Sequence, residues 1–496
     1  MRPVSPSALR PYVCPSCRST RLPSRRKFGS KPAPITDIYD VVCVGGGPAG
    51  LALLAALRAS PATSKLKVAL VETQDLNKAR SWNLDSQQFS NRVSSLTPSS
   101  VSFLQKIGAW DHLDVARTQP YQEMQVWDGE TGSKISFDWS METSPFEDLR
   151  TVATMTENSN LVRALLSRIA ASGGDNLSIF SNTTVSSIEN GGADDADGPD
   201  LSAWPVLSIA PTGSSTASSA APSRIAARLL VGADGINSPV RRYADIGTEG
   251  WDYHRHGVVA TLSLTDQIPA PFPIGTRTAY QRFLPSLGGP IALLPLPNNH
   301  ATLVWSTTVE NAAYLKSLSP GAFIAMVNAA FRLSMPDLQY MMGMKRPATS
   351  VTNLEEDPHE SELTWRLQHT PAVPHLPPMA TGVQEGSVAP SRSASDTHQH
   401  TSRRGLNLGL GDVASLSRTI EYAVDHGMDV GDILTLEHYT AERWATNAKV
   451  GGACDVLHKL YNVPGQGPVA WGRSLGLEII DRIPLVKGFL MRNADS

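Results

Sequence analysis

The sequence has few cysteines, no excess of basic residues and no long apolar run. Four cysteines in 496 residues are too few for a disulfide framework. Cys14 and Cys17 form a lone CxxC without a second pair or a nearby histidine, so no metal site is expected. The net charge of −3 argues against a nucleic-acid-binding protein. Residues 41–57 are uncharged, but a GGGP sequence interrupts them, which argues against a membrane span.

Acidic residues are absent from the first 36 residues, which contain six arginines and two lysines among serines and prolines. This composition is typical of a mitochondrial transit peptide and lacks the apolar core of a secretory signal. We expect a transit peptide over residues 1–36, removed near residues 27–30. The alternative is a plain disordered tail.

The remaining chain has the composition of a globular protein, with 41% hydrophobic and 18% charged residues. Residues 37–44 and 66–72 are short apolar runs typical of buried strands, and the Ala- and Leu-rich residues 48–60 between them predict a helix. Together they predict a βαβ unit. The alternation around a DGETG turn at residues 122–138 predicts a hairpin.

The predicted fold class is α/β: a Rossmann-like FAD-binding βαβ domain with a parallel sheet, an antiparallel-sheet substrate domain, and C-terminal helices. The expected segments are 37–120 (first FAD-binding segment), 121–157 (substrate-domain hairpin), 158–250 (second FAD-binding segment, with a partly disordered insertion at 189–224), 251–365 (antiparallel substrate domain), 366–404 (irregular segment) and 405–496 (third FAD-binding segment and C-terminal helices).

The sequence GGGPAG lies between the first predicted strand and the helix and fits the pattern GxGxxG. The first glycine permits the tight turn, the second leaves room for a pyrophosphate, and the third allows close helix packing. An acid at the end of the next strand suits ribose hydroxyls and repels a 2′-phosphate, which favours FAD or NAD. The residues expected to bind this dinucleotide are Gly45, Gly47, Pro48, Ala49, Gly50 and Glu72.

A second motif, DGINSPVR, follows another predicted buried strand and has the form DGxxSxxR. Here the chain resembles the FAD-dependent aromatic hydroxylases related to p-hydroxybenzoate hydroxylase. In that family the motif lies beside the FAD pyrophosphate, which implies FAD contacts for Asp234, Gly235 and Arg241. Taken alone, the motif also fits a turn followed by a helix cap.

A third segment, GLNLGLGDV, resembles the end of the second FAD motif of the same family. The resemblance implies that Gly405, Leu406 and Asn407 face the flavin, where helix N–H groups stabilise negative charge. Arg92 resembles an early arginine that contacts FAD. Stretches such as QRFLPSLGGPIALLPLP and RGLNLGLGDVASL are most similar to the mitochondrial ubiquinone-biosynthesis hydroxylases of this family.

One element of the family pattern is missing, because the strand and the sequence GDAAH that normally open the second FAD motif are absent. The run PSRSASDTHQHTSRR stands in their place and cannot form a buried strand. Two explanations remain open: a mis-spliced or mis-predicted gene, or a genuine variant that has lost some of its flavin site. We favour the first, because both flanks keep the family register.

The resemblance implies an FAD-dependent monooxygenase that hydroxylates C5 of a polyprenylated hydroxybenzoate in ubiquinone biosynthesis, through a C4a-hydroperoxyflavin. It implies electrons from ferredoxin and its reductase, or from NAD(P)H, within a complex of ubiquinone-biosynthesis proteins. It also implies peripheral contact with the matrix face of the mitochondrial inner membrane. Tyr253, Arg282 and Phe283 are the expected substrate-facing residues. The alternatives are a non-catalytic scaffold, or another FAD hydroxylase or epoxidase of this fold.

Overall fold

The computed structural model describes most of the chain from Ile35 onward. The described residues are 35–83, 85, 88–138, 151–192, 200–212, 223–247, 252–265, 278–344, 357–369, 376–391, 404–461, 467, 472 and 476. The chain divides into the units Met1–Pro34 and Ile35–Ser496, and only the second contains described residues. The expected transit peptide therefore lies outside the described residues, apart from its last two positions, which begin the first strand.

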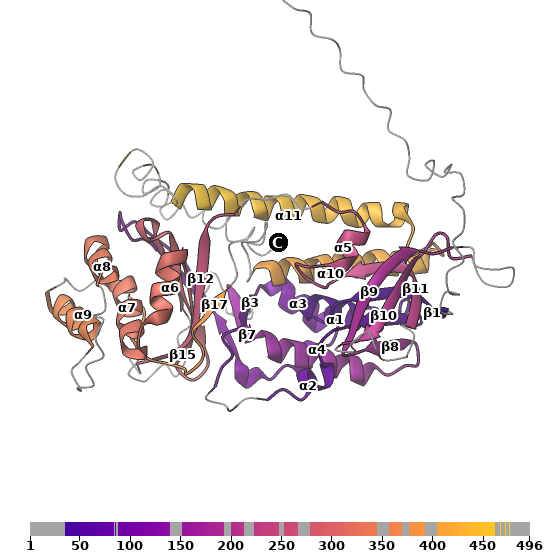
Figure 1. The fold of residues 1–496 in the computed structure, drawn as a ribbon, viewed down its shortest axis with the longest axis horizontal. Coiled ribbons are helices and arrows are strands. Elements are labelled where there is room, and N and C mark those ends of the chain that lie inside the picture. Colours follow the sequence, from indigo (N-terminus) through magenta and orange to yellow (C-terminus); the bar gives the residue numbers. More distant parts are fainter. Residues whose placement is uncertain are drawn as a thin grey trace, which may run out of the picture. The chain divides into compact units, whose positions relative to one another are not determined.

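The first sheet contains the predicted βαβ unit (Figure 1). β1 (Ile35–Val44), α1 (Pro48–Ala59) and β2 (Val68–Val71) follow one another along the chain. β8 (Leu177–Phe180) and β11 (Ser223–Gly232) complete four parallel strands in the order β8-β2-β1-β11. These strands are strongly apolar because both faces of a parallel sheet are covered, and β2 is buried at all four positions.

Two antiparallel strands extend this sheet, β10 (Pro205–Pro211) beside β11 and β9 (Thr183–Asn190) beside β10. The prediction that residues 189–224 are a surface insertion is therefore wrong for the middle of that segment. Leu207 and Ile209 are buried against the sheet, and this short apolar alternation is enough to form a paired strand. The surrounding Gly- and Ser-rich sequence obscured it.

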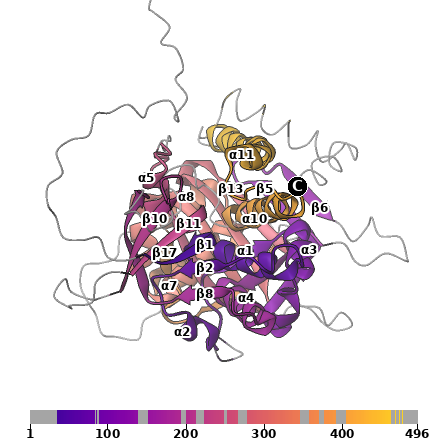
Figure 2. The ribbon, with the colours of Figure 1, turned by 90° about the vertical axis from the view of Figure 1, so that its right-hand side faces the viewer.

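Three helices cover one face of the first sheet (Figure 2). They are α1, α4 (Asn158–Ser172) and α10 (Arg404–Asp425), and Leu54, Leu165 and Ile420, one from each helix, are fully buried. α10 packs beside α1, although more than 340 residues separate them in the sequence. The C-terminal helices thereby complete the core that the βαβ unit begins.

The second sheet is predominantly antiparallel and has the strand order β16-β12-β15-β14-β13-β5-β6, with β17 also paired to β12. One pair departs from the expectation, because β13 and β5 run parallel. Its strands are β5 (Glu123–Asp128), β6 (Lys134–Asp138), β12 (Arg255–Leu264), β13 (Thr278–Leu284), β14 (Gly289–Leu296), β15 (His300–Thr308), β16 (Ala380–Val383) and β17 (Ala389–Ser391). β5 and β6 form the predicted hairpin.

Helices pack on one face of the second sheet and form a core with Trp305, Phe323 and Met326. Thr308, Ser319 and Ser334 each cap the helix that follows by accepting a backbone hydrogen bond. The expected antiparallel domain therefore carries a helical layer that was not predicted. The helices are α6 (Val309–Ser317), α7 (Pro320–Arg332), α8 (Met335–Met342) and α9 (Pro358–His369).

The prediction that residues 366–404 are irregular is wrong for some of that range. The end of α9 and the strands β16 and β17 lie within it, and both strands pair with β12. Their few residues gain stability from an existing sheet edge rather than from their own periodicity. The run that replaces GDAAH begins in β17, and residues 392–403 lie outside the described residues.

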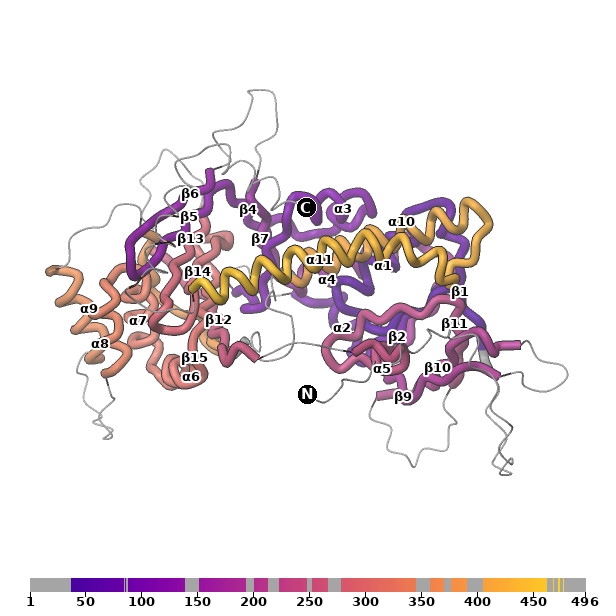
Figure 3. Tube along the Cα trace, turned by 90° about the horizontal axis from the view of Figure 1, so that it is seen from above, coloured from indigo at the N-terminus to yellow at the C-terminus, as the bar shows by residue number. Residues whose placement is uncertain are grey.

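A small third sheet has the order β3-β7-β4 and is antiparallel throughout. Beyond it, the long helix α11 (Ile433–Tyr461) follows α10 and reaches the second sheet (Figure 3). The remaining elements are β3 (Val93–Leu96), β4 (Thr118–Tyr121), β7 (Ala153–Glu157), α2 (Leu76–Arg80), α3 (Pro98–Lys106), α5 (Pro239–Tyr243), η2 (Trp110–His112), η3 (Val115–Arg117) and η5 (Pro285–Leu287).

The predicted fold class is confirmed: a parallel sheet with a βαβ unit, a largely antiparallel second sheet, and C-terminal helices. Among the described residues, no helix combines the length and the apolar character needed to cross a bilayer. The same residues contain no group of three or more metal-binding side chains.

Candidate functional site

The glycine-rich loop turns sharply between β1 and α1. Gly45 has φ of +107°, a conformation that other residues rarely adopt. A Cβ atom on Gly45 would lie 2.2 Å from the carbonyl oxygen of Ala233, and one on Gly50 would lie 2.0 Å from the carbonyl oxygen of Gly45. Both positions therefore require glycine for the turn and for the close approach of the helix.

The N-terminus of α1 is open. Gly47 is its N-cap residue and provides no side-chain cap, Pro48 occupies the first turn, and that turn contains no acidic residue. A Cβ atom on Gly47 would meet nothing within 4 Å, so this side of the loop faces free space. Unpaired N–H groups and the positive end of the helix dipole together favour an anion such as a pyrophosphate.

Glu72 follows β2 and lies directly against the loop. Its carboxylate accepts hydrogen bonds from the backbone N–H of Gly46 and, at 2.7 Å, from that of Gln74. The side chain is buried. The acid predicted from its spacing to the loop is therefore at the loop, where it can accept hydrogen bonds from a ligand's hydroxyl groups.

Asp234 lies at the end of the neighbouring strand β11 and carries an unsatisfied atom. Its Oδ2 is buried and has no hydrogen-bond partner among the described residues. Burial raises the pKa of the Cys43 thiol to about 12, and the charges of Asp234 and Glu72 add to this effect. Two carboxylates thus flank the end of β1, and a buried oxygen without a partner indicates a missing donor.

The rest of the second motif forms a turn and a short helix. Gly235 has φ of +81°, and Ser238 caps α5 by accepting from the N–H of Arg241 at 2.9 Å. The guanidinium of Arg241 donates to the carbonyl oxygen of Ile236 within the same loop. Arg241 therefore stabilises its own turn.

Asn407 in the first turn of α10 joins that helix to the small third sheet. Its Oδ1 accepts from the Thr97 N–H at 3.2 Å and from the Ser100 hydroxyl at 2.8 Å. Its Nδ2 donates to the Ser95 carbonyl oxygen at 2.7 Å. The motif identified Asn407, but its partners precede it by some 310 residues in the chain and could not be predicted from spacing.

The start of α10 also lies close to the dinucleotide loop. A Cβ atom on Gly409 would be 3.7 Å from the Cβ of Ala49. Gly405 is exposed and Leu406 is partly buried against the core that includes α1. The structure therefore brings the first and third predicted segments to one end of the parallel sheet.

Arg92 immediately precedes β3 and is exposed. Its backbone is held, because its carbonyl oxygen accepts from the Asn158 N–H at 3.0 Å and its own N–H donates to the Ser90 hydroxyl at 3.2 Å. Its guanidinium has no partner among the described residues. A fixed backbone with a free cationic side chain is suited to binding a ligand.

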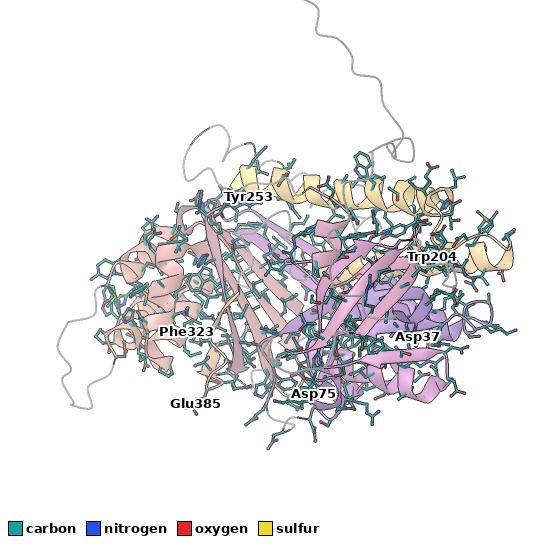
Figure 4. All side chains as sticks on the ribbon, turned by 45° about the vertical axis from the view of Figure 1, so that its right-hand side comes forward. Asp37, Asp75, Trp204, Tyr253, Phe323 and Glu385 are labelled. Carbon is teal, nitrogen blue, oxygen red and sulfur yellow. The ribbon has the colours of Figure 1, made fainter. Side chains whose placement is uncertain are left out.

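The three expected substrate-facing residues separate into two groups. Tyr253 donates to Asp455 of α11 and packs edge-on against His458, with ring centroids 4.1 Å apart (Figure 4). Phe283 stacks on Tyr461 at the end of α11, with centroids 3.7 Å apart and rings inclined by 14°. Both therefore lie where α11 meets the second sheet.

Arg282 has a different position, against the helical layer of the second sheet, so the structure does not support its assignment as a substrate-facing residue. Its guanidinium donates to the carbonyl oxygens of Ala330 at 2.8 Å and Leu333 at 2.9 Å, at the C-terminal end of α7. Burial lowers its pKa to about 10, although nearby Asp128 opposes the shift. Alternation along β13 directs Arg282 to the helical layer and Phe283 to the opposite face.

One edge of the parallel sheet lacks a partner among the described residues. β1 pairs with β11 as far as Gly232, but β10 pairs with it only from Ser223 to Ala226. The loop at Gly431 lies against the carbonyl oxygen of Arg228. Within the described chain, residues 229–232 of β11 are thus paired on one side only.

The residues present fit the dinucleotide portion of FAD. The open N-terminus of α1 can bind phosphates, Glu72 can accept from a ribose, and Asp234 presents a buried oxygen that needs a donor. The exposed guanidinium of Arg92 is available to the phosphates, and for the flavin portion the first turn of α10 is available.

Comparisons with known proteins agree with this geometry. The family described as FAD binding domain matches residues 38–313. The chain is 36% identical over 492 residues to the ubiquinone biosynthesis monooxygenase COQ6 of Schizosaccharomyces pombe, covering 94% of this chain and 93% of the relative. It is 30% identical to the human protein of the same name, covering 92% of each. Both names include the word mitochondrial.

Solved structures share the fold at low sequence identity. The p-nitrophenol 4-monooxygenase PnpA of Pseudomonas putida has a TM-score of 0.56 at 14% identity, covering 93% of this chain and 99% of its own. A Klebsiella pneumoniae HpxO variant complexed with FAD has a TM-score of 0.55 at 11% identity, covering 92% and 99%.

The fold, the dinucleotide loop and the family match define a FAD-dependent monooxygenase. The cofactor is FAD, one of the two dinucleotides that the loop and Glu72 favour and the one that the family resemblance implies. Within this class, the chain belongs to the family of ubiquinone biosynthesis monooxygenases. The mitochondrial location predicted from the N-terminus agrees with the names of these relatives.

Proposed function

We propose that this protein binds FAD and hydroxylates C5 of the aromatic ring of a polyprenylated hydroxybenzoate during ubiquinone biosynthesis. The observation that carries the proposal is the end of the parallel sheet, where an uncapped helix N-terminus lies between two carboxylates. One of them, Asp234, has a buried oxygen without a partner among the described residues. The names of the relatives support the pathway.

In this proposal the dinucleotide half of the site holds FAD mainly through backbone groups. The pyrophosphate is bound by the N–H of Gly47 and by the N–H groups in the first turn of α1 that follow Pro48, which has none. Glu72 accepts hydrogen bonds from the ribose hydroxyls. Arg92 and Arg241 donate to the phosphates, and the buried oxygen of Asp234 accepts from a hydroxyl or N–H group of the ligand. Arg241 first exchanges its bond to the Ile236 carbonyl oxygen for one to the ligand.

The flavin half is proposed to form at the first turn of α10. When bound and reduced, FAD supplies the activation of O₂ and the transfer of one oxygen atom to an electron-rich ring. Gly405, Leu406 and Asn407 place the helix N-terminus beside the flavin, and Asn407 fixes that turn to β3 and α3. The protein must also orient the phenol and exclude water.

Tyr253 and Phe283 are the proposed substrate-facing side chains, because both lie outside the helical layer of the second sheet. Phe283 stacks nearly parallel to Tyr461, so an aromatic substrate could replace or extend that stack. Electrons are proposed to come from ferredoxin and its reductase, or from NAD(P)H. The proposed location is the matrix face of the inner membrane, in a complex with other proteins of the pathway.

A second candidate function is a non-catalytic scaffold, and the one-sided pairing of residues 229–232 within the described chain favours it. A sheet that lacks a strand beside the flavin site would hold the dinucleotide but leave the flavin poorly enclosed. The same observation also fits a mis-spliced or mis-predicted gene, in which the coding sequence for this strand is missing. Sequencing the transcript across codons 385–405 separates an intact motif from a genuine variant.

The deciding experiment is reconstitution of the purified full chain with FAD. We expect a yellow protein with absorbance near 450 nm that forms a hydroxylated product from a prenylated 4-hydroxybenzoate when ferredoxin, its reductase and NADPH are supplied. Hydrogen peroxide is measured in parallel, because reduced flavin in an open site reacts with O₂ and releases hydrogen peroxide without hydroxylating the substrate. A folded, colourless protein contradicts the catalytic proposal, and a yellow protein without product leaves the scaffold function.

A further inference from the structure

A buried ion pair lies outside the residues considered so far. Arg117 ends η3 and Glu157 ends β7, with Nε and Oε2 2.6 Å apart. Their side chains are 6% and 0% exposed. Removing two charges from water is costly, and the attraction between them offsets that cost only when their remaining atoms are also hydrogen-bonded. The partners of those atoms therefore indicate what the pair does.

All of these partners belong to the segment 82–92. Arg117 donates to the carbonyl oxygens of Asp85 at 3.2 Å and Gln88 at 2.5 Å. Its guanidinium also lies over the rings of Trp82 and Phe89, 5.2 Å and 4.9 Å from their centroids.

Glu157 completes the arrangement from the other side. Its Oε1 accepts from the N–H of Ser90 at 2.5 Å. The next residue, Asn158, donates its N–H to the Arg92 carbonyl oxygen at 3.0 Å. The ion pair is thus hydrogen-bonded to the backbone of residues 85, 88 and 90, shortly before Arg92.

The segment is also fastened to the second sheet. The N–H of Phe89 donates to Gln384 Oε1 at 3.0 Å, and Asn91 Nδ2 donates to the carbonyl oxygen of Ser387 at 2.9 Å. The backbone before Arg92 is therefore held by the ion pair and by the second sheet, while its guanidinium has no partner within the described regions of the chain.

We propose that Arg117 and Glu157 are positioning residues that set the affinity for FAD by fixing the place of Arg92. The inference rests on the proposed function, because it requires Arg92 to contact FAD. A guanidinium forms paired hydrogen bonds with phosphate oxygens only in a narrow geometry, so the position of its backbone decides whether it reaches them. If the segment is released, the backbone at Arg92 moves and its contact with the ligand weakens.

The test is a double-mutant cycle on the full chain. Replacing only one partner leaves an unpaired buried charge and endangers folding, so both are replaced together, Arg117→Met with Glu157→Gln. The dissociation constant for FAD is measured from the quenching of flavin fluorescence, in the parent and in the Arg92→Ala background. The melting temperature of the apoprotein is recorded separately.

We expect the paired replacement to weaken FAD binding about tenfold in the parent and less than about twofold in the Arg92→Ala background. Equal losses in both backgrounds, or no loss in the parent, overturn the inference while leaving the proposed function intact. If Arg92→Ala alone has no effect, Arg92 does not contact FAD and the inference fails at its premise. A parent that binds no FAD contradicts the proposed function itself.

A matched control uses the ion pair of Arg366 with Asp337, which joins α9 to α8. Arg366→Met with Asp337→Asn removes the same kinds of group in the helical layer of the second sheet. We expect this replacement to leave FAD affinity unchanged. A tenfold loss in this control would mean that any loss of an ion pair weakens FAD binding, and would overturn the specific role of Arg117 and Glu157.

Discussion

The two halves of the proposed flavin site are built in different ways. The dinucleotide half is closed by backbone atoms of β1, α1 and β11, with a Cβ on Gly50 only 2.0 Å from a neighbouring carbonyl oxygen. The proposed flavin half depends on the side chain of Asn407 at the start of α10, whose partners lie more than 300 positions earlier in the chain. Backbone packing fixes the first half locally, whereas the second half is assembled from distant segments.

The largest effect is expected from Gly50→Ala, with Gly47→Ala as its counterpart. A Cβ on Gly50 collides with backbone, so we expect loss of FAD and ADP binding together with a lower melting temperature. A Cβ on Gly47 meets no other atom within 4 Å, so we expect an unchanged melting temperature of the apoprotein but loss of both ligands. Calorimetric titration with ADP and FAD checks both variants. Normal ADP binding by Gly47→Ala would contradict a pyrophosphate site at the loop.

A smaller and more selective effect is expected from Asn407→Ala. The substitution removes three hydrogen bonds, each contributing about 0.5–1.5 kcal/mol to stability. We expect FAD affinity to fall about tenfold while ADP affinity stays unchanged, because ADP tests only the dinucleotide half. The dissociation constants of the variant for FAD and for ADP are measured and compared with those of the parent. If ADP affinity falls equally, the two halves are not separable.

Phe283→Leu is expected to affect substrate binding, whereas Arg282→Met is expected to affect the stability of the fold. Phe283→Leu removes an aromatic face, so we expect KM for the aromatic substrate to rise about threefold to tenfold with unchanged FAD affinity. Arg282→Met leaves carbonyl groups at the end of α7 unsatisfied, so we expect a lower melting temperature and an unchanged KM. Steady-state kinetics and thermal unfolding measure both. The reverse pattern would return Arg282 to the substrate face.

The smallest effect is a lack of reaction at Cys43. Its thiol is buried and its pKa is raised to about 12, so the neutral form persists well above the usual range for cysteine. We expect iodoacetamide at pH 8.5 to label Cys454, which is partly exposed, and to spare Cys43. Mass spectrometry of tryptic peptides gives the result. Labelling of Cys43 would show that the dinucleotide half opens in solution.

Local features of the site could be predicted from the sequence, and long-range ones could not. The turn at Gly45 and the acid at Glu72 were predicted from one short strand–loop–helix–strand segment, and the structure has both. The strand β10 was missed because its alternation is short and lies between Gly- and Ser-rich stretches. The direction of Arg282 depends on the position of α7, which comes later in the chain. The pairing of Arg117 with Glu157 joins residues 40 positions apart.

The edge at residues 229–232, unpaired within the described chain, also bears on how the protein behaves with other copies of itself. A strand edge offers N–H and C=O groups that pair with any extended chain, and proteins usually block such edges with charge, proline or a covering segment. Here the edge carries Leu230 and Val231, both only partly buried. An extended segment that pairs with these four residues is therefore expected to lower the tendency of two copies to associate edge to edge.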